Sequence, residues 1–479
     1  MRGGTCDHPP PRGRRSLFPA LALSLACAAA LPAETAPTLT IGPERTGSFS
    51  GEISVEVKAA DGGSSIHREA ISLRVLPESF ILVDLPERRI FSLPVSLGLS
   101  PAGSGGDRFA FVLGGGEGAL RFEGRYTPRG QGIEGRVGQG GLSGRFALSR
   151  QAMAAERGRP LEVMVRGGVL RGTLMLPAGP AGDIGPGGFH LAIFVPGSGS
   201  TDRDGNNYQV PGTNDSTLQL ALALASRGIA SFRYDKRGVG ESWALAPDES
   251  RLSFDDYIED LRAILARLAK EPGFSGISLV GHSEGSLVAA ATLAAAVSLP
   301  VLPWERQPDL IVLATGSTSA RDTFAKAIET SPVELVDEGR AILEAMLSGR
   351  TWPAPSEYFA EVFRPSFQPY LSSWLRYDLR TELPRIGGRI LLVEGDRDMQ
   401  VDIGNFLGLA MARADAAAVV VRGMNHVLKE VPAEIDLNYA AFSDPSFALS
   451  PDLVETLASF MEGKPLPGSL VRVDGGRVP

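Results

Sequence analysis

The chain has 479 residues, of which 43% are hydrophobic and 21% are charged, and a formal net charge of −8. This composition is typical of a soluble globular protein, and the length predicts two or three domains. The negative net charge and the lack of a Lys/Arg cluster argue against a nucleic-acid-binding protein.

The first 33 residues are typical of an export signal. Arg12, Arg14 and Arg15 precede an apolar stretch at 17–31, and small residues ending at Ala33 form a candidate cleavage site. The apolar stretch is too short to span a bilayer, so we expect no stable membrane insertion after signal removal. The arginine pair also suits a twin-arginine signal, so the export route stays open. The expected location is periplasmic or secreted.

Both cysteines of the chain, Cys6 and Cys27, lie in this predicted signal. A lipoprotein would need Cys27 as the acylated residue, and Ser24 three positions before it fits that pattern poorly. Lipidation is therefore the less favoured prediction. Once the signal is removed, the protein would hold no thiol, no disulfide and no cysteine metal site.

Residues 34–150 predict a small β-rich domain. Short runs at 51–57 and 71–75 alternate apolar and polar residues, and Gly-rich turns separate such runs. A loose Gly-x-aromatic or Gly-x-aliphatic rhythm between 119 and 148 indicates successive antiparallel strands. Dimerisation, docking and glycan binding all remain open as roles for this domain.

After a polar linker at 151–160, residues 161–470 alternate strand and helix patterns. This alternation predicts an α/β domain, a mostly parallel sheet with helices on both faces. In such sheets the chemistry gathers at the carboxyl ends of the strands. The expected strands are 163–166, 169–176, 191–195, 229–234, 277–280, 310–314, 390–394 and 417–421. The expected helices are 218–226, 254–270, the segment after Ser283, and 451–461.

A Gly-x-Ser-x-Gly motif centred on Ser283 joins an apolar strand to a helix. This strand–turn–helix setting is the one that a nucleophile elbow requires. The turn strains Ser283, while Gly281 and Gly285 keep side chains out of the crowded space around it. Ser283 is therefore the predicted nucleophile. The structural alternative is an ordinary Gly-rich turn.

A serine nucleophile needs a base and an acid that orients this base. The chain has five histidines: His8 lies in the signal, His67 in the β-rich domain, His190 at a strand start and His282 inside the elbow, where side chains usually point away. Elimination leaves His426, on the loop after the strand 417–421, as the predicted base.

The acid is expected on a loop between Ser283 and His426. Asp396 and Asp398 both follow the strand 390–394. Asp398 lies further beyond the strand end, where the loop can fold back to His426, so it is the preferred acid. Asp396 is expected to shape the turn. The loop after 310–314 offers no acid before Asp322.

Acyl transfer also needs donors for a tetrahedral oxyanion. The N–H of Glu284, directly after the nucleophile, is one predicted donor. The loop after 191–195 supplies the other, with Ser198 as first choice and Gly199 as second; its glycines let the backbone approach the substrate, so Gly199 is also a predicted substrate contact. The charged stretch 202–204 is expected to be a self-satisfied turn, and the loop 235–242 to be structural support.

A helical, aromatic-rich insertion at 317–380 interrupts the alternation. It predicts a cap with its own small core that also lines an apolar substrate pocket. Phe363 and Trp374 are the predicted substrate contacts. The aromatic residues of this stretch are Tyr358, Phe359, Phe363, Phe367, Tyr370, Trp374 and Tyr377.

Together these motifs resemble the α/β-hydrolase superfamily, and within it the serine esterases and serine aminopeptidase-like hydrolases. The resemblance covers about 161–467 and implies an α/β-hydrolase fold with a helical cap, preceded here by the β-rich domain. One departure is Pro196-Gly197, where many members have His-Gly. The matching stretches are 197–206, 234–242, 281–285, 395–398 and 425–426.

The expected function is an exported serine hydrolase, a carboxylesterase acting on a small-molecule ester through Ser283, His426 and Asp398. A peptidase or a thioesterase on the same fold stays open, and a non-catalytic binding protein is the remote alternative. No metal and no organic cofactor is implied. The sequence does not indicate an oligomeric state.

Overall fold

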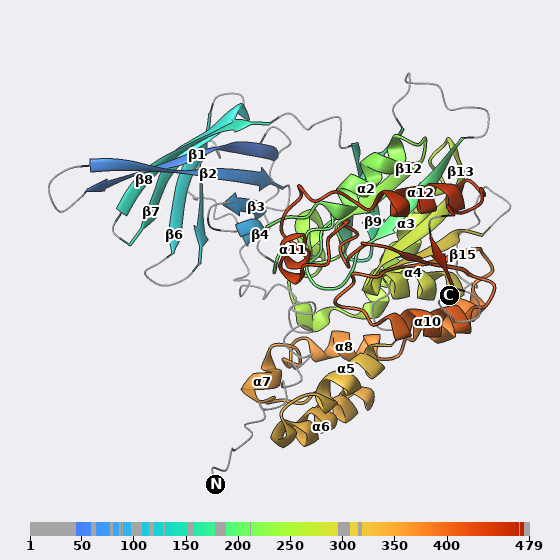
Figure 1. Ribbon diagram of the computed structural model, residues 1–479. Coiled ribbons are helices and arrows are strands. Elements are labelled where there is room, and N and C mark those ends of the chain that lie inside the picture. Colours follow the sequence, from blue (N-terminus) through green and yellow to red (C-terminus); the bar gives the residue numbers. More distant parts are fainter. Residues whose placement is uncertain are drawn as a thin grey trace, which may run out of the picture.

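Two β-sheets, each at the centre of its own domain, organise the computed structural model (Figure 1). The predicted signal peptide and most of the predicted linker lie outside the residues that the structure describes. These residues are 45–58, 64–76, 80–85, 88, 90–96, 108–114, 119–127, 130–140, 142–151, 158–177, 188–210, 212–295, 307–314, 319–468 and 470–473.

The N-terminal β-domain (45–151) is one antiparallel sheet of eight strands in the order β4-β3-β2-β1-β8-β7-β6-β5. Alternate residues of β8 are buried, as expected for a strand with one face on a core. The prediction of a β-rich domain is confirmed. Its strands are β1 (Gly47–Lys58), β2 (Ser64–Val75), β3 (Phe80–Leu85), β4 (Ile90–Ser96), β5 (Arg108–Leu113), β6 (Leu120–Tyr126), β7 (Gly132–Gln139) and β8 (Leu142–Arg150).

The α/β domain (158–473) holds a nine-stranded sheet in the order β17-β16-β15-β14-β13-β11-β12-β10-β9. Strands β11 to β16 are parallel to one another, and β9, β10 and β17 pair antiparallel at the two sides. The predicted mostly parallel sheet is confirmed. Its strands are β9 (Arg159–Val165), β10 (Gly168–Met175), β11 (Phe189–Val195), β12 (Ala230–Tyr234), β13 (Phe274–His282), β14 (Asp309–Leu313), β15 (Ile390–Gly395), β16 (Ala417–Val421) and β17 (Val471–Arg472).

Helices cover both faces of this sheet. Helices α2 (Ser216–Ala225) and α12 (Pro451–Met461) share one apolar core with the sheet, and α3 (Phe254–Leu268), α4 (Glu284–Ala294) and α10 (Ile403–Ala412) share the other. Every residue of α4 is buried, so this helix is covered by the protein on all sides. Because β11 and β13 are neighbours in the sheet, the loops that follow them lie side by side at its carboxyl edge.

A group of short helices forms the predicted cap between β14 and β15, beside the sheet (Figure 1). Aromatic side chains fill its interior and pack against α3, as in the contact of Tyr370 with Tyr257. The cap comprises α5 (Ala320–Glu329), α6 (Val336–Leu347), α7 (Glu357–Ala360), α8 (Gln368–Trp374), α9 (Leu379–Glu382) and the 3-10 helices η8 (Val333–Leu335) and η9 (Leu383–Arg385).

The two domains touch at the 3-10 helix η5 (Gly240–Leu245), which follows β12. The Trp243 ring lies 5.3 Å from the ring of Phe80 on β3, and Leu76 and Leu82 complete this apolar contact. Beside it, Arg74 of β2 donates a hydrogen bond to Glu241 over 3.2 Å. The β-domain is therefore attached to a loop at the carboxyl edge of the larger sheet.

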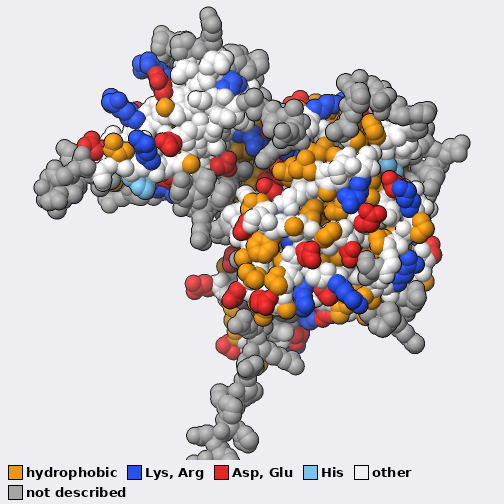
Figure 2. All heavy atoms as spheres, turned by 45° about the horizontal axis from the view of Figure 1, so that its top comes forward, with side chains coloured by type: hydrophobic (Ala, Val, Ile, Leu, Met, Phe, Trp, Pro, Cys, Tyr) orange, Lys and Arg blue, Asp and Glu red, His pale blue; other side chains and the backbone are white. Residues whose placement is uncertain are grey.

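The surface of the α/β domain mixes charged and hydrophobic side chains, whereas the β-domain shows fewer hydrophobic ones in the same view (Figure 2). Leu222, Ile435 and Tyr439 are among the exposed hydrophobic residues. In the described part of the chain, no helix combines the length and the apolar character needed to cross a bilayer. Helix α11 (Ile435–Ala440) carries two of these exposed side chains.

Candidate active site

Ser283 lies at the sharp turn between β13 and α4, with φ 51° and ψ −123°. This left-handed backbone is strained for a residue with a side chain. The two glycines of the motif are required by close contacts, because a Cβ on Gly281 would lie 2.4 Å from the Ser286 Cα and one on Gly285 would lie 2.2 Å from the Val195 oxygen. The local sequence therefore folds as the strand–turn–helix that was predicted.

The structure brings Asp398 and His426 together. His426 Nδ1 lies 2.8 Å from Asp398 Oδ2, and both side chains are almost fully buried. The other carboxylate oxygen accepts N–H bonds from Gln400 and Val401. Burial alone would raise the pKa of Asp398, but His426 and these two N–H groups hold it below its ordinary value. Asp398 therefore stays ionised and can orient the imidazole.

The two competing acids lie elsewhere. Asp396 is exposed, and its carboxylate accepts the N–H of Gly423, so it holds the turn before His426. Asp322 sits in the first turn of α5, where its carboxylate pairs with Arg380. Of the three aspartates, only Asp398 contacts the imidazole of His426.

Two buried asparagines hold the loops of Asp398 and His426 against each other. Asn425 donates to the side-chain oxygen of Asn438 on α11, and Asn438 donates to the backbone oxygen of Arg397. Asn438 was not among the residues predicted from the sequence, because nothing local links α11 to either loop. The feature of the sequence that could have indicated its role is its position shortly after His426.

His282 contacts the backbone of the predicted base. Its Nε2 donates a hydrogen bond to the His426 oxygen over 2.7 Å. Burial, and then the neighbouring His426, lower the pKa of His282 from 6.5 to about 4. His282 is therefore neutral near neutral pH, and the contact with the carbonyl oxygen places its proton on Nε2. The motif gave no sign of this role.

The predicted oxyanion donors lie at the ends of the neighbouring strands β11 and β13. Among the residues that the structure describes, the N–H groups of Ser198, Gly199 and Glu284 donate to no protein acceptor. The loop itself is fixed, since Thr201 Oγ1 donates to the Ser198 oxygen over 2.8 Å. These N–H groups are therefore available to a ligand.

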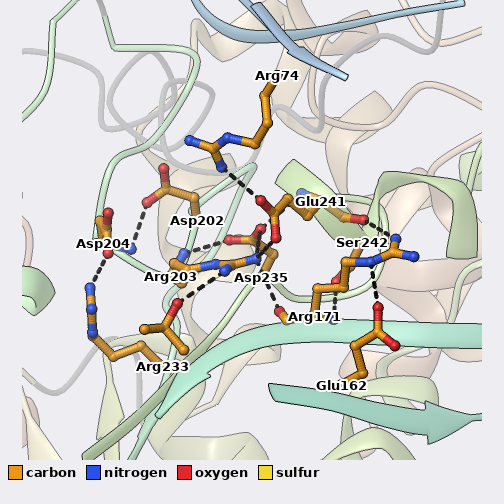
Figure 3. Close-up of polar contacts among 11 residues, drawn as sticks. Arg74, Glu162, Arg171, Asp202, Arg203, Asp204, Arg233, Asp235, Glu241 and Ser242 are labelled. Carbon is orange, nitrogen blue, oxygen red and sulfur yellow. Dashed lines mark hydrogen bonds and ion pairs between the residues drawn. The ribbon is translucent and has the colours of Figure 1, made fainter. Parts of the chain in front are cut away.

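The charged part of the same loop forms an ion-pair network (Figure 3). Arg203 donates to Asp235 and to Glu241, each over 2.7 Å, and Glu241 also accepts from Arg74 of the β-domain. Burial would raise the pKa of Glu241, but Arg203 and Arg74 lower it to about 2. The network ties the loop after β11 to the loop after β12, which fits the structural role expected for residues 235–242.

Asp202 closes a turn within its own loop. Its Oδ1 accepts the N–H groups of Asp204 and Asn206 over 2.9 Å each. Burial, followed by the charges of Asp204 and Asp235, raises the pKa of Asp202 to about 8. These contacts agree with a self-satisfied turn at Asp202, whereas Arg203 and Asp204 pair outside their own loop, with Asp235, Glu241 and Arg233.

The structure places both predicted substrate-contact aromatics in a packed core. Phe363 is fully buried and meets Phe324 edge-on, and Trp374 is 8% exposed and stacks on Phe254 of α3. These contacts fit the other part of the prediction, that the cap has its own small core. In the described residues there is no group of three His, Cys, Asp or Glu side chains that could hold a metal.

The chain is similar to several known hydrolases. At 25% identity over 249 residues, 47% of this chain matches 82% of the 2-(acetamidomethylene)succinate hydrolase of Mesorhizobium japonicum. Similar solved structures include Est1E from Butyrivibrio proteoclasticus with ferulic acid (15% identity, TM-score 0.39, 59% of this chain and 96% of that chain). Another is a puromycin-hydrolyzing peptidase from Mycobacterium tuberculosis (13% identity, TM-score 0.40, 85% and 70%).

The model of the alpha/beta hydrolase family matches residues 192–435, just over half of the chain. This range runs from β11 through the elbow and the cap to the loop of His426. The chain belongs to the alpha/beta hydrolase family.

Proposed function

We propose that this protein is an exported serine hydrolase that cleaves carboxylic esters with small or medium acyl groups. The observation that carries the proposal is the 2.8 Å hydrogen bond between His426 and a buried Asp398, in a chain whose Ser283 has the strained backbone of a nucleophile elbow. A base held by an acid and a serine on such a turn are the parts of an acyl-transfer site.

In the proposed reaction, His426 accepts the proton of Ser283 Oγ while this oxygen attacks the ester carbonyl. The N–H groups of Glu284 and Ser198 stabilise the oxyanion. His426 then gives the proton to the leaving alcohol, and water releases the acyl group from Ser283 by the same steps. In the described part of the chain Ser283 Oγ has no hydrogen bond to His426; such bonds often tighten only when substrate binds.

Glu284 does not supply the acid that a peptidase acting on a free amino terminus would need. A peptidase of that kind needs an accessible acid to bind the ammonium group of its substrate. The Glu284 side chain is buried and paired with Lys236, so it does not offer one. The relative from Mesorhizobium japonicum, whose name gives a small-molecule substrate, also supports a small substrate here.

Hydrolysis of p-nitrophenyl esters of increasing acyl length tests the proposal, together with labelling by a fluorophosphonate. Ser283→Ala should abolish both turnover and labelling. Ser286→Ala is the matched control, because its buried hydroxyl lies in the first turn of α4, directly after Ser283, and among the described residues it bonds to the Gly281 oxygen; it should keep both. Failure of the folded wild type to label would refute the serine-hydrolase proposal, and labelling without ester turnover would contradict the ester substrate.

Export is part of the same proposal, supported by the predicted signal at residues 1–33. We expect the protein made in a bacterial host to reach the periplasm or the medium with Glu34 as its first residue. Cell fractionation and N-terminal sequencing measure this. An uncleaved chain retained in the cytoplasm would contradict it.

A further inference from the structure

Lys236 is a buried cation directly behind the predicted oxyanion hole. It follows β12, is 4% exposed, and its Nζ donates a hydrogen bond to the Gly197 oxygen over 2.6 Å. The Tyr257 ring lies 5.1 Å from the same Nζ. Burial of an ammonium group costs free energy unless the group is paired. A lysine buried at this position therefore needs an explanation.

The contact with Gly197 fixes the peptide that carries the Ser198 N–H. In a planar trans peptide the C=O and the next N–H point in opposite directions, and no described peptide bond is cis. With the Gly197 oxygen held by Lys236, the Ser198 N–H must point to the other side of that peptide. A cation on the carbonyl also polarises the peptide and makes its N–H a stronger donor.

The same ammonium group reaches the residue that carries the other donor. Lys236 Nζ lies 3.7 Å from Glu284 Oε1, and both side chains are almost fully buried. Tyr370 of the cap also hydrogen-bonds the Glu284 carboxylate. One lysine therefore contacts the Gly197 carbonyl, which belongs to the same peptide as the Ser198 N–H, and the side chain of Glu284, whose own N–H is the other predicted donor.

We propose that Lys236 is a positioning residue for the oxyanion hole, which aligns and polarises the Ser198 N–H through Gly197 and fixes Glu284 through the ion pair. This inference rests on the proposed serine-hydrolase function of the site. Lys236 touches no reacting atom, and its effect should be confined to states that carry an oxyanion.

The test compares Lys236→Met with wild type in the full chain. We expect kcat for a p-nitrophenyl ester to fall about 10- to 100-fold, less than the roughly 10²- to 10³-fold loss of a whole oxyanion donor, while KM stays within about threefold. A trifluoromethyl ketone, which Ser283 Oγ would convert to a tetrahedral oxyanion, should bind more weakly by about the same factor as kcat. The matching alcohol, which forms no oxyanion, should bind unchanged.

Arg237→Met is the matched control, since Arg237 is the neighbouring buried cation but bonds to Asp260 and to the oxygens of Arg166 and Leu245, not to the Gly197 oxygen. It should lose stability as Lys236→Met does but keep kcat within about threefold. If Lys236→Met does not fold, Lys236→Arg, which keeps the charge but has a bulkier head group, should show the same selective loss of kcat.

The chain also allows a chemical rescue, because its two cysteines are residues 6 and 27. In the full chain with Cys6→Ser and Cys27→Ser, alkylation of Lys236→Cys with 2-bromoethylamine restores an ammonium group of nearly the native length. This should recover most of kcat. If the wild type shows Ser283-dependent activity, and if kcat and the affinity for the ketone do not change when Lys236 is replaced, this inference is wrong but the proposed function stands. A wild type without Ser283-dependent activity would instead overturn the proposed function.

Discussion

The rings of His282 and His426 lie 5.0 Å apart, but only the His426 ring is hydrogen-bonded to a carboxylate. Burial keeps His282 neutral, and its Nε2–H holds the backbone of His426. In the proposed reaction the two histidines thus have different tasks, proton transfer by His426 and support of its backbone by His282.

Replacing Asp398 or Asp396 by asparagine should show which aspartate orients His426 and which one shapes the turn. Asp398→Asn removes the charge that orients the His426 imidazole, and we expect kcat to fall about 10³- to 10⁴-fold with an intact fold. Asp396→Asn keeps an oxygen for the Gly423 N–H and should change kcat less than about threefold. Steady-state kinetics at one pH measure both, and equal losses would contradict the assignment.

The low pKa of His282 predicts that the protein loses stability in mild acid. The unfolded chain binds a proton at this residue near pH 6.5 and the folded one only near pH 4, so the unfolded state gains protons first as the pH falls. The free energy of unfolding should decline between these values by at most about 3 kcal/mol.

His282→Gln keeps a donor for the His426 oxygen but does not titrate. Urea unfolding at pH 7, 6, 5 and 4 should therefore show a smaller decline for this variant than for wild type. Parallel declines in the two proteins would show that other groups cause the acid sensitivity.

Ser283, Asp398 and His426 could be proposed from the sequence because each follows a strand in a recognisable local pattern. The roles of Lys236 and His282 could not be proposed in this way, since these depend on how loops from different strands approach each other in space. Lys236 Nζ meets an oxygen 39 residues earlier, and His282 meets one 144 residues later. No local pattern contains such pairings.

At the scale of elements, the apolar runs predicted every described strand from β10 to β16, since short buried strands between turns leave a clear pattern. Helix α3 starts with a capping box, in which the Ser253 N–H donates to the Asp256 carboxylate. The cap was recognisable as aromatic and helical. Its sequence could not show that Phe363 and Trp374 face inward, because aromatic side chains suit a packed core and an apolar pocket equally well.

Replacing a glycine by alanine should have opposite effects in the elbow and in helix α10. In Gly285→Ala the new Cβ would clash with the Val195 and Pro196 oxygens. We therefore expect the free energy of unfolding to fall by about 3 kcal/mol and ester turnover to be lost. Gly408 lies in α10 with no atom within 4 Å of a Cβ, and Gly408→Ala should be neutral or gain up to about 1 kcal/mol. Thermal unfolding and ester turnover measure both; a stable, active Gly285→Ala would mean that the elbow is less tight than described.

For the whole molecule, the contact between the domains involves residues far apart in the chain. Arg74 and Glu241 are 167 positions apart, and no pattern in residues 34–150 indicates which surface of the β-domain is covered. The two domains could be predicted separately, but not their contact.

Phe80→Ala should weaken this contact. Phe80 is 2% exposed and packs on Trp243, so the variant should lose about 3 kcal/mol and unfold its β-domain at a lower temperature than its α/β domain. Ile66→Ala, at a side chain 63% exposed on β2, is the control and should change little. Calorimetry resolves the transitions, and a single unshifted transition for Phe80→Ala would contradict a stabilising contact.

The contact at η5 also limits how this protein can exchange parts with its homologues. Positions 74 and 80 face positions 241 and 243 across the domain boundary. A chimera that takes its β-domain from another lineage therefore inherits half of an ion pair and half of an aromatic contact. We expect these four positions to be inherited as one unit, so that recombination between the domains succeeds only where both parents agree at all four.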